Sequence, residues 1–119
     1  GTGLGQPIVV ENRPGAGGMV GSDIVAKARG DAHVVMMSNA ASHGIGPVLY
    51  RSVPYDPLGD FIHVALVGNF PSVLCVGEAV PARSLAEFLA WLRARPAGSV
   101  GAGSPGIGSS NHLAIELFN

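Results

Sequence analysis

Charged side chains are scarce in this chain. Seven basic and eight acidic residues make up 13% of its 119 positions and leave a formal net charge of −1. No cluster of lysine or arginine stands out, although nucleic-acid binding requires one to neutralise the phosphates. The composition therefore excludes nucleic acid as an expected partner.

Cysteine is nearly absent too. The single Cys75 lies in the apolar run 73–76, where we expect a small buried hydrophobe and no internal disulfide. No apolar run approaches the roughly 18 residues of a membrane span, and no signal-peptide pattern opens the chain. The four histidines are too scattered for a local metal-ligand spacing, so we expect neither a metal nor a cofactor.

Glycine and proline, by contrast, are abundant, with 18 and 9 residues. They separate short apolar runs, as in folds whose strands and helices alternate through tight loops. The runs predict strands at 8–10, 34–37, 64–67 and 73–76, and a very short strand near Val100. The expected fold class is α/β.

Local signals predict the helices. Val20, Ile24 and Ala28 recur at the spacing of a buried helical stripe, and 47–50 favours a short helical turn. Residues 84–87 form a capping box, in which the serine accepts an orphan N–H and the glutamate reaches back to the cap. Pro96 and Gly98 end this helix. A last helix is expected to start at a cap by Ser109 or Ser110, with its apolar side chains facing inward (Leu113, Leu117 and Phe118).

The glycine-rich stretch 100–118 allows three chemical interpretations. Gly101, Gly103 and Gly106 match the letters of a dinucleotide-binding loop, but the expected strand before them is very short and Pro105 stiffens the turn. A serine-hydrolase elbow at Ser104 is unfavourable, because the next residue must donate an N–H and Pro105 has none. Catalytic residues are therefore not expected.

The third interpretation is capture of a small anion by main-chain N–H groups at a helix start. Residues 103–110 would serve this purpose, and the loops 15–18 and 38–44 offer similar donors. Little fixed positive charge lies near them, which favours neutral hydrogen bonds to a carboxylate. The structural alternative is that these segments are merely turns that need glycine.

Four segments together resemble the Bug family, the extracytoplasmic solute receptors of tripartite tricarboxylate transporters. They are LGQPIVVENRPGAGG at 4–18, Pro54–Pro57 with Asp60 and Phe61, the box at 84–87, and 103–104 through 112–114. The resemblance covers nearly the whole chain. It implies a partial type II periplasmic-binding-protein-like fold, with residues 1–72 in the first lobe and 73–119 at the start of the second. Since family members are at least about twice as long, we interpret the chain as an internal fragment whose unpaired strand edges would favour self-association.

The resemblance also implies a function and a site. The expected protein is a periplasmic receptor that holds a small carboxylate (a di- or tricarboxylate, an amino acid or an aromatic acid) and presents it to membrane permease subunits, without breaking a bond. A fragment of a dinucleotide-binding oxidoreductase is the alternative. The implied ligand-binding residues come from two loops: Ser38, Asn39, Ala40, Ser42 and His43 in the first, and Ser104, Gly106, Gly108, Ser109, Ser110 and His112 in the second.

Overall fold

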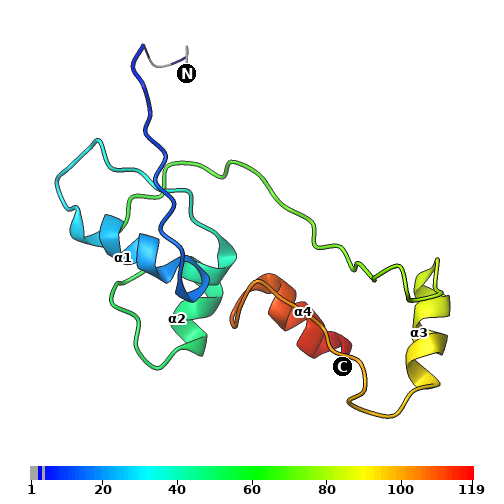
Figure 1. Cartoon of the computed structure of the whole chain (residues 1–119). Coiled ribbons are helices and arrows are strands. Elements are labelled where there is room, and N and C mark those ends of the chain that lie inside the picture. Colours follow the sequence, from blue (N-terminus) through cyan, green and yellow to red (C-terminus); the bar gives the residue numbers. More distant parts are fainter. Residues whose placement is uncertain (1–2, 4) are drawn as a thin grey trace.

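The computed structural model describes residue 3 and residues 5–119, and its regular structure there is helical (Figure 1). The elements in chain order are the 3-10 turn η1 (Ala16–Gly18), α1 (Met19–Lys27), the π-helical turn η2 (Ala41–Ile45), α2 (Gly46–Leu49), α3 (Leu85–Arg93) and α4 (Ser110–Phe118). A long extended segment leads from the first half to α3, and the chain then returns toward α2 through α4. Within the described part, no helix is long and apolar enough to cross a membrane.

The entry to α1 depends on backbone that only glycine adopts without strain. Gly15, Gly17 and Gly18 have φ angles of +133°, +65° and +96°, and Ala16 between them is also left-handed at +46°. A Cβ on Gly15 would lie 2.8 Å from a methyl carbon of Val20. The expected turn at 15–18 is confirmed, and it sets where the following helix begins.

The buried face of α1 is not the expected stripe. Met19, Ser22 and Ala26 are buried, whereas Val20 and Ile24 are exposed. Met19 reaches the second helical segment, since a Cβ on Gly46 would lie 3.1 Å from its sulfur. The predicted stripe of Val20, Ile24 and Ala28 was therefore wrong, because the covered side of α1 is the one that carries Met19, which meets α2, and Ala26, which lies in the core with Tyr55.

The core of the described chain is small. Met19, Ala26 and Tyr55 form its buried apolar cluster, and three partly buried side chains pack against it: Tyr50, Val53 and Phe61. The radius of gyration is 18.8 Å, where a compact chain of this length has about 13.5 Å. Most of the second half therefore lies outside the packed body.

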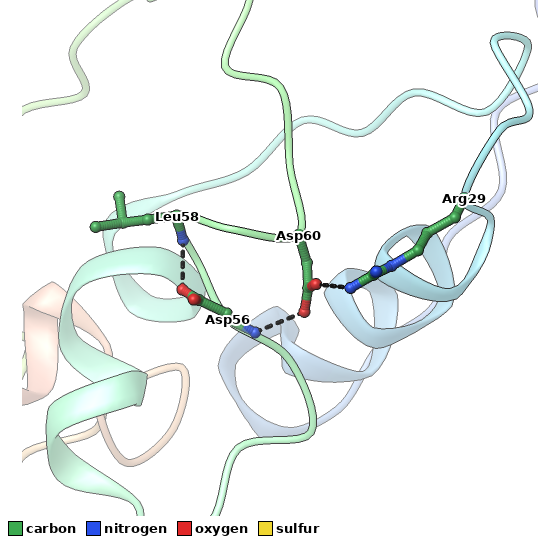
Figure 2. Close-up of polar contacts among 4 residues, drawn as sticks. All are labelled: Arg29, Asp56, Leu58 and Asp60. Atoms are coloured by element: carbon green, nitrogen blue, oxygen red, sulfur yellow. Dashed lines mark hydrogen bonds and ion pairs between the residues drawn. The ribbon is translucent and has the colours of Figure 1, made fainter.

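A turn between Asp56 and Asp60 fastens the chain to the end of α1 (Figure 2). The Asp56 carboxylate accepts the Leu58 N–H at 2.9 Å, and the Asp60 carboxylate accepts the Asp56 N–H at 2.8 Å. Asp60 also forms an ion pair with Arg29, two residues beyond α1. These bonds place Phe61 against the core.

The two later helices start at the expected serines. Ser84 accepts the Glu87 N–H at 3.3 Å, while the glutamate accepts the N–H of Arg83 at 2.7 Å rather than that of the cap itself. Ser109 accepts the His112 N–H at 3.1 Å, so Ser109 and not Ser110 is the cap of α4. The inward face predicted for α4 was largely wrong, because Leu117 and Phe118 are exposed and only Leu113 is partly buried.

The apolar runs predicted as strands form no β-ladder in residues 5–119. Most of their large side chains are exposed in extended backbone, including those at 8–10, 64–67 and 73–76; Cys75 is exposed as well, contrary to expectation. A strand requires a partner strand for its hydrogen bonds, and the described residues bring no two of these runs together. The α/β class is thus not confirmed by this structure.

Candidate functional site

Three loops that are far apart in the sequence meet beside α2. The Tyr50 hydroxyl donates to the Ile107 carbonyl at 3.0 Å, across 57 positions. A Cβ on Gly108 would lie 3.1 Å from Leu49 Cδ2 and 3.4 Å from the Tyr50 ring. A Cβ on Gly17 would lie 3.9 Å from the same Ile107 carbonyl oxygen. The structure therefore brings the loops 15–18, 38–45 and 104–109 to one place, which we call the loop junction.

The close approach of these loops explains why glycine occupies positions 17 and 108. Gly108 is buried and has φ +82°, so a side chain there would be strained and would also press on α2. Gly17 also approaches the loop 38–45, because its Cβ would be 3.5 Å from that of Ala41. Both glycines are needed for contact between main chains.

The first predicted loop is more regular than expected. Residues 41–45 form the π-helical turn η2, and the side-chain oxygen of Asn39, two residues before it, accepts the Ser42 N–H at 3.1 Å. Ser42 is only 1% exposed, and its hydroxyl lies 3.3 Å from the Asn39 carbonyl oxygen and 3.0 Å from His43 Nδ1. Ser38 and Ala40 are exposed beside it. Ser42 thus holds the loop in shape, with its polar atoms already paired inside the chain.

His43 packs into an aromatic cluster that the sequence did not reveal. Its ring centroid lies 4.7 Å from that of Phe61 and 5.9 Å from those of Tyr55 and His63. Partial burial, and then the nearby His63, lower the pKa of His43 below its usual 6.5. The motif at 54–61 was the available signal, although nothing in its spacing indicated contact with residue 43.

The second loop leaves more polar groups free. Ser104 and Ser110 are exposed, and Gly106 accepts the Ser109 N–H at 3.2 Å. His112 lies one turn into α4, with Nε2 3.6 Å from the Glu116 carboxylate and a buried Nδ1 that has no partner among the described residues. Since Ser109 caps the helix through His112, the two residues act together to fix the start of α4.

Two main-chain donors remain at that start. The N–H groups of Ser110 and Asn111 occupy the first two positions of α4 and bond to no described residue. Such groups carry the positive end of the helix dipole and favour an anion. The arrangement can bind a carboxylate by neutral donors next to the loop junction. Whether the predicted residues hold a ligand stays a prediction.

Other features of the described chain do not point to a different chemistry. It contains no group of three or more His, Cys, Asp or Glu that could hold a metal ion. Two open hollows of about 430 and 470 Å³ lie away from the junction, one lined by the ends of α3 and α4 and one by residues 76–83.

Comparison with known proteins bears on this arrangement. The family model described as "Tripartite tricarboxylate transporter family receptor" matches residues 2–119. Protein BugT of Bordetella pertussis is 40% identical over 116 residues, covering 97% of this chain and 35% of that protein. A UPF0065 protein from the tcbD-tcbE intergenic region of Pseudomonas sp. is 40% identical over 115 residues, covering 97% of this chain and 34% of that protein.

A further relative, a UPF0065 protein of Bordetella pertussis, is 32% identical over 115 residues, covering 97% of this chain and 35% of the relative. No solved structure matches the chain. The chain spans about a third of the length of these curated relatives. The match over nearly every residue shows that the chain belongs to the tripartite tricarboxylate transporter receptor family, as its motifs predicted.

Proposed function

We propose that this chain is the part of a periplasmic solute receptor that captures a small carboxylate at the loop junction. The ligand would be a di- or tricarboxylate, an amino acid or an aromatic acid, delivered unchanged to the permease subunits of a tripartite tricarboxylate transporter. Membership of a receptor family supports this function. A nucleotide-dependent oxidoreductase has no comparable support. In a dinucleotide-binding motif the last glycine lies at the start of the helix, whereas α4 starts four residues after Gly106.

The observation that carries the proposal is the convergence of the two predicted ligand loops. The bond from Tyr50 to Ile107 and the fit of Gly108 against α2 bring together segments about 60 positions apart. Their meeting leaves the free N–H groups of Ser110 and Asn111 beside the junction. A carboxylate there would accept hydrogen bonds from main-chain donors, in keeping with the low charge of the chain.

We also propose that the chain is part of a larger, two-lobed fold. Residues 1–72 would belong to the first lobe of a two-lobed receptor and residues 73–119 to the start of the second, with the ligand between them. The extended apolar runs would then be strands that pair within a sheet of a receptor-length protein. The lengths of the relatives are consistent with such a size.

A proline substitution tests the donor directly. Ser110→Pro removes one N–H from the first helical position, where proline is well tolerated, and Ser109 already has the extended backbone (φ −72°, ψ 155°) that a following proline requires. A hydrogen bond to a charged group contributes about 1.5–3 kcal/mol, so carboxylate affinity should fall roughly ten- to a hundredfold. Titration calorimetry of the chain with a panel of carboxylic acids measures the change.

Two matched variants complete the experiment. Ser110→Ala keeps the N–H and removes only the hydroxyl, so it should bind more tightly than the proline variant. Ser72→Ala changes an exposed serine outside both loops and should bind as the parent chain does. The proposal fails if no acid binds, if NAD alone binds, or if the proline variant keeps full affinity while its helical circular dichroism is unchanged.

A further inference from the structure

Two histidines from separate segments meet in the aromatic cluster of the first half of the chain. His43 belongs to the loop 38–45, and His63 lies just after the turn 56–60. Their ring centroids are 5.9 Å apart, and the Phe61 ring lies 4.7 Å from His43 and 6.5 Å from His63. We propose that this pair is a proton-sensitive latch, which holds the loop against the turn while the rings are neutral and releases it when both are charged.

One ring of the latch is fixed to the turn. His63 Nε2 lies 3.0 Å from the Pro57 carbonyl oxygen. Because a carbonyl oxygen only accepts, Nε2 carries the hydrogen, and the charged ring retains this bond. A positive charge on His63 therefore stays with the turn, whereas a positive charge on His43 belongs to the loop, so repulsion between the two rings acts to separate the loop from the turn.

The other ring can take up a proton where it stands. His43 Nδ1 lies 3.0 Å from the Ser42 hydroxyl, which can donate to the neutral ring or accept from the charged one. In the second case the hydroxyl hydrogen can turn toward the Asn39 carbonyl oxygen, 3.3 Å away. The hydroxyl thus favours neither state of the ring, and the balance depends on burial and on the second imidazole.

No negative charge compensates the pair. Among the described residues neither ring forms an ion pair with a carboxylate. The other ionisable side chains of residues 54–63 and of α1 already have partners within the chain: Tyr55 with the Ser42 carbonyl, Asp56 with the Leu58 N–H, Asp60 with Arg29, and Asp23 with Lys27. The segment of α2 carries no ionisable side chain. A second positive charge in the cluster therefore meets only the first.

The direction of the pH effect follows from these surroundings. Partial burial, and then the nearby His63, lower the pKa of His43 below its usual 6.5. A group whose pKa is lowered by the docked loop stabilises that state above its usual pKa, and this stabilisation is lost as the pH falls through the lowered value. Two like charges about 6 Å apart also repel each other in a partly buried setting. The loop should therefore be docked at about pH 7.5 and increasingly released at about pH 5.5.

The latch has a consequence for binding that rests on the proposed function. The loop 38–45 supplies the first group of proposed ligand residues, and it reaches the loop junction through Ala41, whose Cβ would lie 3.5 Å from a Cβ on Gly17. Release of the loop would remove one side of the carboxylate site. Affinity for a carboxylate should then fall as the surroundings become acidic, whereas release of the loop itself needs no ligand.

Amide hydrogen exchange of the whole chain, followed by NMR, measures loop release directly. The N–H groups of Ser42 and His43 both bond to Asn39, so their protection factors report whether the loop keeps its docked shape. Protection factors are corrected for the pH dependence of exchange in an unfolded chain. Between about pH 7.5 and pH 5.5 those of the loop should fall roughly tenfold, while those of α1 stay unchanged.

Three variants identify the rings responsible. His63→Gln keeps a side-chain donor for the Pro57 carbonyl but cannot be charged, so the change should shrink to about threefold, the part that is due to burial of His43. The double variant His43→Gln/His63→Gln should show no change with pH. His33→Gln is the matched control, since His33 is an exposed histidine beside Asp31 and outside the cluster, and it should keep the full change. Circular dichroism confirms that each variant is folded.

The latch is overturned if loop protection does not depend on pH, or if the amides of α1 lose protection together with those of the loop. It is equally overturned if His63→Gln keeps the full change or if His33→Gln removes it. Each of these results would assign the pH response to something other than the pair.

Calorimetric titration with benzoate at the same two pH values tests the consequence for binding, since the carboxyl group of benzoate stays ionised over this range. Affinity should be lower at the acidic pH in the parent chain and less so in His63→Gln. Loop release with equal benzoate affinity at both pH values, or with no benzoate binding at all, would contradict the proposed use of this loop in binding. The exchange result would still support the latch in that case.

Discussion

Tyr55→Phe removes one oxygen atom and should be unusually destabilising. In the π-helical turn η2, the Gly46 N–H bonds to the Ala41 carbonyl. The next carbonyl, that of Ser42, would need the N–H of residue 47, but Pro47 has none. The Tyr55 hydroxyl donates to this carbonyl at 2.6 Å and replaces the missing helical bond.

The expected loss of stability follows from the burial of both hydrogen-bonding partners. Tyr55 is 7% exposed and Ser42 is 1% exposed, so water cannot easily replace the hydroxyl. A buried acceptor without a partner costs about 1–3 kcal/mol, and we expect a loss of about 2 kcal/mol in the free energy of unfolding. At roughly 4 °C per kcal/mol for a chain of this size, Tm should fall by about 8 °C.

Tyr50→Phe is the matched control, because it deletes the same atom from a hydrogen bond of 3.0 Å in a solvent-exposed setting. Water can satisfy the Ile107 carbonyl there, so the cost should be about 0.5 kcal/mol or less. Urea unfolding followed by circular dichroism compares the two variants. Equal losses, or a larger loss for Tyr50→Phe, would refute the assignment of Tyr55 as the partner that Pro47 requires.

Two other perturbations follow from the site. Because partial burial and His63 lower the pKa of His43, the unfolded chain binds protons more readily near that residue, and stability should fall as the pH drops through about 6.5. Urea titrations at several pH values measure this, and His43→Gln should flatten the profile. Gly108→Ala places a Cβ at φ +82° and 3.1 Å from Leu49, so it should cost about 1–3 kcal/mol and open the loop junction. Gly103→Ala, in open space within the same loop, should cost less than about 0.5 kcal/mol by thermal melting, and equal costs would contradict the close approach.

Sequence reasoning succeeded where an interaction lies within a few residues. The caps at Ser84 and Ser109 and the turn at 15–18 depend on hydrogen bonds or φ angles of neighbouring positions, so their residue types identify them. The motifs were equally local, and they were sufficient to place the chain in its family. What they could not indicate was which loops would meet.

The misassigned face of α1 shows the limit of predicting a buried helix face from the spacing of apolar residues. Val20 and Ile24 are more apolar than Ser22, yet Ser22 is fully buried because its hydroxyl bonds to the Gly18 carbonyl at 3.1 Å. That bond makes a polar side chain acceptable in the interior. Ala26 on the same side of the helix joins the small core with Met19 and Tyr55, which periodicity alone did not predict.

The predicted strands were not confirmed for a related reason, because a strand depends on hydrogen bonds with a segment that is distant in the sequence. Residues 64–67 have a strand-forming composition, but a strand also needs hydrogen bonds from another segment, and composition does not name that segment. In residues 5–119 the other predicted strands are unpaired as well, including 8–10 and 73–76. The apolar run is therefore left extended and exposed, and its structure depends on what pairs with it.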